Sequence, residues 1–370
     1  MTSVFKYAHA SAAQWSEATQ ACLTQLGEIP RTANLGFIYV TDIFAGHMQE
    51  ILTRVKQSTG VEHWVGSAGL GICCSGQEYL DRPAIVIMLG EFPEHSFQVF
   101  PTIHNMDEIP DTVSVGNSAA YFGIVHGDPE NQQVPKLIEQ FAARMESGFI
   151  VGGLTSSRNE NVQVADKPTH GGLSGVVFTS AVALTTRLTQ GVSPLGGLHE
   201  ITECEDNVIV SIDGRPALDV FREDIGEVLS RDLRRLSNYI FAGLHITGSD
   251  TGDYLVRNLV GIDVERKLLA IGDVVENGRQ LLFCRRDGAS AVHDMQRMLN
   301  EIKSGLAGEP RGAVYYSCLG RGESMFGADS EELKMISRTL GDIPLVGFFA
   351  NGEISHNRLY GYTGVLTVFL

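Results

Sequence analysis

The sequence predicts an α/β (α+β) fold in which repeated strand-helix-strand units form layered mixed sheets covered by helices. Two patterns carry this prediction: apolar strands and one-sided helices alternate in three similar segments, and each segment contains a Val-Gly pair at the same place. Size is the third observation, because 370 residues exceed what one hydrophobic core normally spans. We therefore expect two domains with a pseudo-repeat.

Each segment opens with a short apolar, aromatic and β-branched run, which is typical of a buried strand. A helical pattern with a single apolar stripe follows each run. In the third segment, Asp329 and Glu332 have the spacing of a capping box at the start of the helix. The runs are LGFIYV (35–40), AYFGIV (120–125) and GAVYYS (312–317), and the stripes are Met48, Ile51, Leu52, Val55; Leu137, Ile138, Phe141, Met145; and Leu333, Ile336, Leu340.

A second predicted strand follows each helix and ends in Val65-Gly66, Val151-Gly152 or Val346-Gly347. A strand, a helix and a strand of this length form a right-handed parallel pair with the helix on one face. Glycine after a buried strand permits a positive φ and the close approach of another backbone. We therefore expect a tight glycine loop after each second strand, followed by closing strands that start near residues 84, 175 and 364.

Residues 208–290 interrupt this repeat. They contain the hairpin-like segment NVIVSIDG, an amphipathic helical pattern over residues 217–237, and four further strand patterns separated by turn residues. A last helical pattern leads into the third segment. Glycine and proline cluster in QGVSPLGG, residues 190–197, so we place the domain limits at 1–192 and 193–370.

Composition and charge narrow the classes of function. The net charge of −16 leaves no surplus of positive charge to hold phosphates, so we do not expect nucleic acid as a partner. The sequence contains no run of 18 apolar residues, which argues against a membrane span. Its first residues lack a secretory signal pattern, which argues against secretion. Its six cysteines form no C-x-x-C pair and indicate reduced thiols, so we expect a cytoplasmic protein.

Several stretches resemble the FIST family, whose members pair a FIST N-terminal with a FIST C-terminal domain. The resemblance implies a sensory or ligand-binding module of signalling proteins, with a small ligand such as an amino acid. It rests on YYSCLGRG (315–322), IPLVGFFANGEI (343–354), DYLVRNLVGID (253–263), NVIVSIDGRPALDVF (207–221) and the two Val-Gly segments of the first half.

One branch of the family resembles nitric-oxide sensors that bind haem and regulate a histidine kinase or a cyclic-dinucleotide enzyme. The resemblance therefore implies haem as a candidate cofactor and such an enzyme as a candidate partner. No kinase or cyclase segment occurs within these 370 residues, so we expect the signal to pass to a separate protein.

Candidate ligand contacts gather where the predicted strands end. Glu353 follows a strand in a glycine-lined loop, where a carboxylate can bind an amine or orient a water. Arg257 and Arg321 carry the planar guanidinium that binds a carboxylate or a haem propionate through two hydrogen bonds. The expected ligand contacts are Ser67, Gly69, Gly153, Thr155, Ser156, Arg257, Cys318, Arg321, Phe348, Asn351, Gly352 and Glu353.

Cys318 lies three residues before Arg321, and a nearby guanidinium lowers the pKa of a thiol. Cys318 is therefore a candidate metal or haem ligand, or a redox thiol. The candidate axial ligands of a haem or metal are His95 and His104, which flank an aromatic stretch, and His356, which follows the glycine-glutamate loop. Each of these residues can instead be an ordinary packed or solvated side chain without a role in ligand binding.

Three classes of function remain open. The first is a sensor in which the repeated glycine loops converge on a ligand pocket between the two halves. The second is a thiol-dependent enzyme with Cys318 as its nucleophile and Glu353 or His356 as its base. The third is a ligand-free interaction scaffold. The segment AGLGICC lacks the third glycine of a dinucleotide fingerprint, and no Walker A, H-E-x-x-H or G-x-S-x-G motif occurs, so the sensor is favoured over the enzyme.

Overall fold

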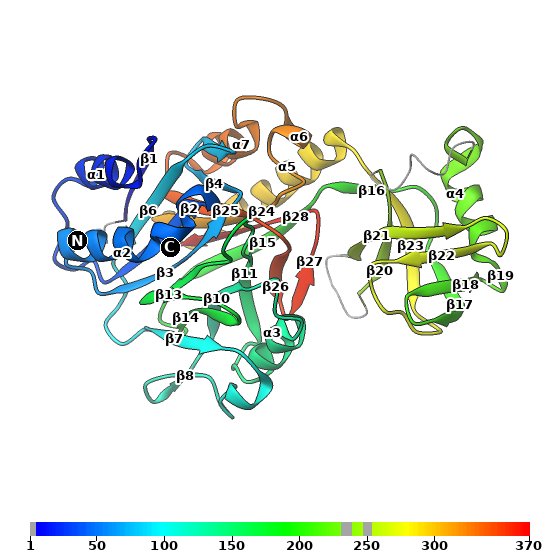
Figure 1. The fold of residues 1–370 in the computed structure, drawn as a ribbon, viewed down its shortest axis with the longest axis horizontal. Coiled ribbons are helices and arrows are strands. Elements are labelled where there is room, and N and C mark those ends of the chain that lie inside the picture. Colours follow the sequence, from blue (N-terminus) through cyan, green and yellow to red (C-terminus); the bar gives the residue numbers. More distant parts are fainter. Residues whose placement is uncertain (1–4, 231–238, 247–253) are drawn as a thin grey trace. The chain divides into compact units, whose positions relative to one another are not determined.

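The computed structural model describes residues 5–230, 239–246 and 254–370, and these form two compact units (Figure 1). Unit 1 comprises residues 1–190 and 294–370, and unit 2 comprises residues 191–293. The chain enters unit 2 after Gln190 and returns to unit 1 within helix α5 (Gly288–Gly305). The chain therefore passes between the two units twice, whereas the predicted domain limits place a single boundary near residue 192.

Unit 1 consists of three repeats, and each repeat supplies four strands to one six-stranded sheet. In every sheet the two strands on either side of the crossover helix, here called the first and second strands, are parallel, and the closing strand pairs antiparallel with the first. The predicted mixed sheets are therefore confirmed. One further strand of the sheet precedes the first strand in each repeat. The strands are β1 (Lys6–Ser11), β2 (Leu35–Thr41), β3 (His63–Gly69) and β6 (Ala84–Gly90) in repeat 1; β7 (Phe97–Ile103), β10 (Phe122–Gly127), β11 (Phe149–Leu154) and β14 (Leu173–Phe178) in repeat 2; and β15 (Leu184–Gln190), β24 (Gly312–Cys318), β25 (Leu345–Ala350) and β28 (Thr363–Phe369) in repeat 3.

The other two strands of each sheet form a hairpin that comes from a different repeat. The hairpins are β4 (Gly71–Cys74) with β5 (Gln77–Leu80), β12 (Gln163–Ala165) with β13 (Lys167–Thr169), and β26 (Glu353–His356) with β27 (Arg358–Tyr360). β4 follows β3 but pairs with β25 of repeat 3. β26 follows β25 but pairs with β11 of repeat 2, and β12 follows β11 but pairs with β3 of repeat 1. The exchange is cyclic.

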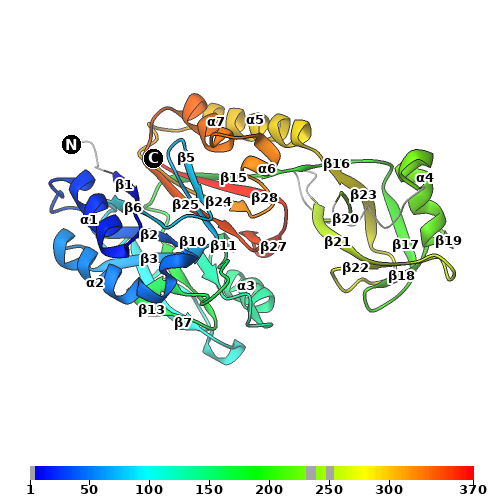
Figure 2. The ribbon, with the colours of Figure 1, turned by 45° about the horizontal axis from the view of Figure 1, so that its top comes forward.

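Helices cover the outer face of each sheet of unit 1 (Figures 1 and 2). The apolar stripes predicted for α2, α3 and α7 pack into these outer layers. None of the described helices combines the length and the apolar character needed to cross a membrane. The covering helices are α1 (Trp15–Leu26) and α2 (Met48–Thr59) on the sheet of repeat 1, α3 (Val134–Ala143) on that of repeat 2, and α5 with α7 (Glu331–Leu340) on that of repeat 3.

The inner faces of the three sheets share one apolar core. Phe37 of repeat 1, Phe178 of repeat 2 and Phe348 of repeat 3 are fully buried in it. Burial of large aromatic side chains is a dominant favourable contribution to folding. Since each sheet contributes to the same core, no sheet of unit 1 buries its inner face alone.

The capping box predicted at the start of α7 is wrong. Ser330 precedes the helix with a left-handed backbone and provides no side-chain cap. The Glu332 side chain is fully buried and forms an ion pair with Arg321. The spacing fits a surface cap, but the fold gives this carboxylate a different partner.

The Val-Gly pairs lie inside the second strands, which corrects the prediction of loops at their ends. A Cβ atom added to any of these glycines would lie only 1.7–1.8 Å from a carbonyl oxygen of the first strand. The close backbone approach expected at these glycines is therefore confirmed. The paired positions are Gly66 with Ile38, Gly152 with Val125, and Gly347 with Tyr315.

Unit 2 contains a closed ring of antiparallel strands in the order β17-β18-β22-β21-β20-β23. The hairpin, the helix and the four strands predicted for this region are present. Helix α4 (Ala217–Ser230) is kinked at Gly226, and residues 231–238, which the prediction included in the helix, lie outside the described residues. The strands are β16 (Val192–Pro194), β17 (His199–Glu205), β18 (Val208–Ile212), β19 (Arg215–Pro216), β20 (Ile240–His245), β21 (Tyr254–Asp263), β22 (Leu268–Ile271) and β23 (Gln280–Arg286).

Replacing Gly66 with alanine is expected to destabilise unit 1, because the new methyl group would overlap the Ile38 carbonyl. We expect a loss of about 3 kcal/mol in the free energy of unfolding, measured by urea titration. Gly46→Ala is the matched control, since a Cβ atom there meets no heavy atom within 4 Å. Equal stability of the two variants would contradict the prediction.

Candidate functional site

The strand ends of the three repeats meet inside unit 1, as the repeated pattern predicts. The hydroxyl oxygens of Ser67 and Thr155 are 2.8 Å apart. Ser156 Oγ donates to the Phe349 carbonyl at 2.5 Å and accepts from the Leu70 amide at 3.0 Å. These three hydroxyl side chains are buried, and their hydrogen bonds join the sheets. They are engaged with protein partners where we expected them to line a pocket.

Two of the predicted glycines pack against the second strand of repeat 3. A Cβ atom on Gly69 would lie 3.2 Å from Phe348 Cβ, and one on Gly153 would lie 2.6 Å from Ala350 Cβ. Gly153 also pairs in register with Glu353. The structure thus brings together nine predicted contacts, Ser67, Gly69, Gly153, Thr155, Ser156, Cys318, Phe348, Gly352 and Glu353, and leaves Asn351 exposed.

The Glu353 carboxyl is fully buried at this meeting point. Its Oε2 atom accepts hydrogen bonds from the Thr363 amide at 3.0 Å and from Thr363 Oγ1 at 2.8 Å. Its Oε1 atom has no donor in hydrogen-bonding geometry among the described residues, although the Cys318 thiol lies beside the carboxyl. Burial raises the pKa of Glu353 to about 8, in spite of the bonds from Thr363. The carboxyl is therefore mostly protonated at neutral pH.

Arg321 is the centre of a buried ion pair on the helix-covered side of the repeat 3 sheet. Its Nε donates to Glu332 Oε1 at 2.7 Å, and the same oxygen accepts from Tyr315 Oη at 2.6 Å and Ser317 Oγ at 3.1 Å. Burial alone would lower the pKa of Arg321, but the Glu332 carboxylate raises it, so the guanidinium stays charged. Arg321 uses Nε for the fold, and its Nη1 atom is left without an acceptor among the described residues.

Glu78 adds a second carboxyl to this cluster and was missed by the sequence analysis. It lies on the exchanged hairpin β4–β5, and its Oε1 accepts from the Glu323 amide at 3.2 Å. Its Oε2 atom is buried without a partner among the described residues. Burial, with a smaller contribution from the Glu332 charge, raises the pKa of Glu78 to about 7. No local pattern identifies Glu78, because its hairpin joins the sheet of repeat 3 only in the folded chain.

Three buried polar atoms without partners therefore surround one loop, residues 318–322 after β24. They are Glu78 Oε2, Arg321 Nη1 and Glu353 Oε1. Native proteins satisfy nearly all buried polar groups with protein, water or a ligand, so three such atoms on residues in or beside a single loop are unusual. The other buried atoms without partners in the described ranges belong to Ser96, His126, Asn161 and Arg311.

The surroundings of Cys318 favour a protonated thiol. Its Sγ accepts a hydrogen bond from the Gly320 amide at 3.5 Å. Burial, followed by the nearby Glu353 charge, raises the pKa of Cys318 to about 12, and these effects outweigh the lowering by Arg321. The thiolate is the nucleophilic and metal-binding form, and it is scarce at neutral pH. The geometry places Glu353 beside Cys318, as a thiol-dependent enzyme would require, but burial favours the protonated thiol over the nucleophilic thiolate.

Arg257 and the candidate haem ligands have other surroundings. Arg257 belongs to unit 2, where its Nε donates to Asp273 at 2.7 Å. His95 and His104 are exposed, and His356 Nδ1 is 2.9 Å from Asn357 Oδ1. Within residues 5–230, 239–246 and 254–370, no group of three His, Cys, Asp or Glu side chains is arranged to hold a metal ion.

A further polar contact occupies equivalent positions of the three first strands. Tyr39 Oη is 2.9 Å from Tyr316 Oη and 3.2 Å from His126 Nε2, and all three side chains are fully buried. Burial lowers the pKa of His126 to about 3, so the imidazole is neutral. Each of these residues directly follows the one that pairs with the Val-Gly glycine of its repeat, a signal that comparison of the three segments could have revealed.

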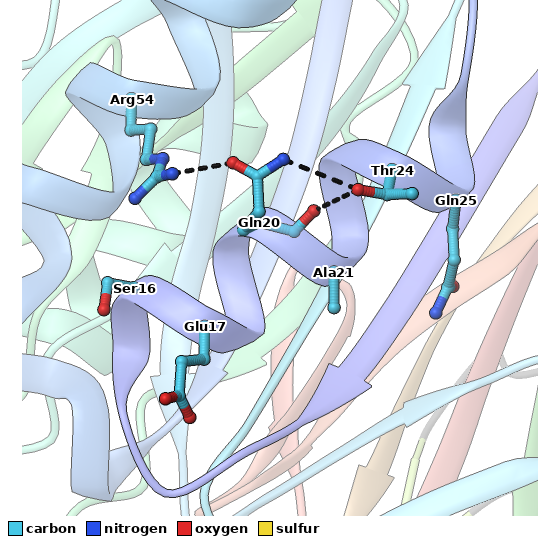
Figure 3. A pocket seen from close by; sticks show the side chains of 7 residues that line it. All are labelled: Ser16, Glu17, Gln20, Ala21, Thr24, Gln25 and Arg54. Atoms are coloured by element: carbon cyan, nitrogen blue, oxygen red, sulfur yellow. Dashed lines mark hydrogen bonds between the residues drawn. The ribbon is translucent and has the colours of Figure 1, made fainter.

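Two surface hollows lie on repeat 1, away from the predicted contacts. In the first, between α1 and α2 (Figure 3), Gln20 Oε1 accepts a hydrogen bond from Arg54 Nη2 at 2.6 Å. Neither hollow is lined by a predicted site residue. The first is lined by Ser16, Glu17, Gln20, Ala21, Thr24, Gln25 and Arg54, and the second by Lys56, Gln57, Gly60, Val61, Glu62, His63 and Asp166.

Comparison with known proteins gives a family match over most of the chain. Residues 34–215 match the FIST N domain, and residues 217–356 match the FIST C domain. The chain is 29% identical over 344 residues to "Uncharacterized protein Rv0628c" of Mycobacterium tuberculosis (strain ATCC 25618 / H37Rv), with 87% of each chain covered. It is also 29% identical over 345 residues to "Uncharacterized protein Mb0898c" of Mycobacterium bovis (strain ATCC BAA-935 / AF2122/97), with 87% of this chain and 86% of the relative covered.

Replacing Glu332 with glutamine is expected to destabilise the protein strongly. The change removes the charge that balances the buried Arg321 guanidinium. Breaking a buried pair in this way costs about 3–5 kcal/mol in the free energy of unfolding, which urea titration measures. Glu331→Gln on the same helix, where the carboxylate pairs with Arg338 at the surface, should change stability little. A mild effect of Glu332→Gln would show that the pair is dispensable.

Replacing Glu353 with glutamine is expected to remove part of the pH dependence of stability. The pKa of this carboxyl rises from 4.5 to about 8 on folding, so the folded protein holds the proton more tightly than the unfolded chain. The stabilisation is complete below pH 4.5. It is lost as the pH rises from 4.5 toward 8, by about 1.4 kcal/mol in the free energy of unfolding for each pH unit. Urea titrations across this range should give a flatter profile for Glu353→Gln. Parallel profiles of the wild type and the variant would refute this.

Proposed function

Because the chain belongs to the FIST family, whose domains are generally sensory domains of signalling proteins, we propose that it senses a small ligand at the loop of residues 318–322. The observation that carries the proposal is the set of three buried polar atoms without partners around this loop. Two of them are carboxyl oxygens and one is a guanidinium nitrogen. A ligand that contacts all three would satisfy groups that the protein leaves unsatisfied.

The chemistry of these atoms favours a ligand with an ammonium group and a carboxylate, such as an amino acid. Arg321 Nη1 is a cationic donor that binds a carboxylate oxygen well. Glu353 Oε1 and Glu78 Oε2 are matched by the N–H donors of an ammonium group. Because both carboxyls are mostly or partly protonated near neutral pH, an ammonium ligand would displace protons when it binds.

The loop is well placed to change the fold when a ligand binds. Glu78 and Glu353 are carried by two different exchanged hairpins, β4–β5 and β26–β27. A ligand between these carboxyls would fix both hairpins relative to the loop after β24. A ligand shifts a conformational equilibrium only if it binds one state better than the other, and closure of the two hairpins on the ligand supplies such a difference.

The signal would then pass to a separate signalling protein, such as a histidine kinase or a cyclic-dinucleotide enzyme. The sensory character of the family supports this step. Haem and nitric oxide form no part of the proposal, because it rests on the unpartnered polar atoms around residues 318–322, and haem binding stays a prediction. An absorption spectrum of protein produced with haem present checks that prediction separately, because bound haem gives a Soret band.

The test is a thermal-shift screen with the twenty common L-amino acids, followed by calorimetry of those that raise the melting temperature. A ligand present at about 100 times its Kd should stabilise the folded protein by about 2.7 kcal/mol. Any binding amino acid is then compared with the same compound lacking its α-amino group. We expect the deaminated compound to bind at least tenfold more weakly, because it offers no ammonium group to the carboxyls.

Glu353→Gln and Glu78→Gln should each weaken the binding, whereas Glu331→Gln, a surface variant near the site in sequence, should leave it unchanged. Binding that survives both carboxyl variants would place the ligand elsewhere. A screen without any stabilising amino acid would exclude this ligand class.

A further inference from the structure

In unit 2, a histidine is held between two carboxylates that come from two different elements. His199 lies at the start of β17, and its Nδ1 is 2.6 Å from Asp213 Oδ2 in the turn after β18. Its Nε2 is 2.9 Å from Asp224 Oδ2 on α4. The side chains of His199 and Asp224 are only 17% and 13% exposed, so water competes weakly for these hydrogen bonds.

This geometry requires the charged form of the histidine. A neutral imidazole has one N–H donor and can bond only one of the two carboxylates, whereas an imidazolium donates from both nitrogens. Loss of the proton would therefore break one of the two bonds and leave the other ring nitrogen facing a carboxylate oxygen. The arrangement is complete only when His199 carries its proton.

The carboxylates are themselves held in place. Asp213 Oδ1 accepts from the Glu200 amide at 2.9 Å. A Cβ atom added to Gly196 would lie 2.2 Å from Asp224 Cγ, so Asp224 packs directly on this backbone. Both carboxylates are therefore oriented toward the imidazole by contacts of their own.

Among the described residues, the charged groups next to this triad are Arg215 and Glu223, which pair with each other, and Asp219, which lies beside both. The positive charge of Arg215 favours the ionised form of Asp213, and the negative charge of Glu223 favours the protonated form of His199. Burial lowers the pKa of His199, but the bonds to Asp213 and Asp224 together raise it above 6.5. The charged form is thus favoured in the folded state to a higher pH than in the unfolded chain.

We propose that His199, Asp213 and Asp224 form a proton-operated latch that holds the first turns of α4 on the strands of unit 2. The latch is closed while His199 is protonated and opens as the imidazole loses its proton. Its stabilisation is complete below pH 6.5 and is lost as the pH rises through the raised pKa of the folded state. The latch is independent of the ligand proposed for unit 1.

Hydrogen exchange measured by mass spectrometry tests the latch in the full chain. After correction for the intrinsic effect of pH on exchange, amides of residues 217–224 should lose protection as the pH rises above 6.5 and through the raised pKa of His199, by about tenfold for each unit by which folding raises that pKa. His199→Gln should remove this dependence. His63→Gln is the matched control, because His63 pairs with a single carboxylate, Asp166 at 3.0 Å, and should leave the profile of α4 unchanged.

An NMR titration of the His199 ring gives a second readout that does not depend on the stability of a His199 variant. We expect the ring to titrate above 6.5 in the wild type and at a lower pH in Asp224→Asn, which keeps the shape but removes one charge. Titration of His199 below 6.5, or the same exchange profile of α4 in the wild type and in His199→Gln, would overturn the proposal.

Discussion

The hydrogen bonding of three exchanged hairpins is the constraint on which unit 1 depends. The second strands β3, β11 and β25 each have their own first strand on one side and a hairpin of another repeat on the other. Without the hairpin, each second strand would expose a row of unpaired backbone groups, which is a costly and aggregation-prone edge. Because the exchange runs in a cycle, removal of any one hairpin opens a sheet in a different repeat.

The glycines opposite the first strands serve the same arrangement. They let β3, β11 and β25 approach β2, β10 and β24 more closely than any other residue allows. The sheets can then bring Tyr39, His126 and Tyr316 into mutual contact in the shared interior. The three repeats therefore share equivalent packing contacts as well as a sequence pattern.

The local elements of this fold could be predicted because their signals are local. Apolar runs and one-sided stripes mark β2, α2 and β3 and their equivalents, and turn residues separate the strands of unit 2. The exchanged hairpins could not be predicted, since which repeat a hairpin pairs with depends on long-range contacts. The return of the chain to unit 1 within α5 was missed for the same reason.

The same limit applies to the candidate site. The strand-end positions of Ser67, Thr155 and Glu353 could be predicted, because the repeated pattern places them at equivalent points along the chain. Their hydrogen-bond partners could not, because they come from other sheets. Arg321 was expected to bind a ligand, but Glu332, which was assigned to a helix cap, reaches it in the interior. Burial in the folded chain then sets which protonation state is favoured, as in Cys318, whose pKa it raises.

The candidate site draws residues from both regions that match the family domains. Glu78 belongs to the region that matches the FIST N domain, whereas Arg321 and Glu353 belong to the region that matches the FIST C domain. All three residues lie in unit 1, because β4–β5 completes the sheet that contains β24 and β25. A ligand at residues 318–322 would therefore contact both regions at once. The hairpins that carry Glu78 and Glu353 complete the sheets of repeats 3 and 2, so both carboxyls lie on strands whose hydrogen bonds join one repeat to another.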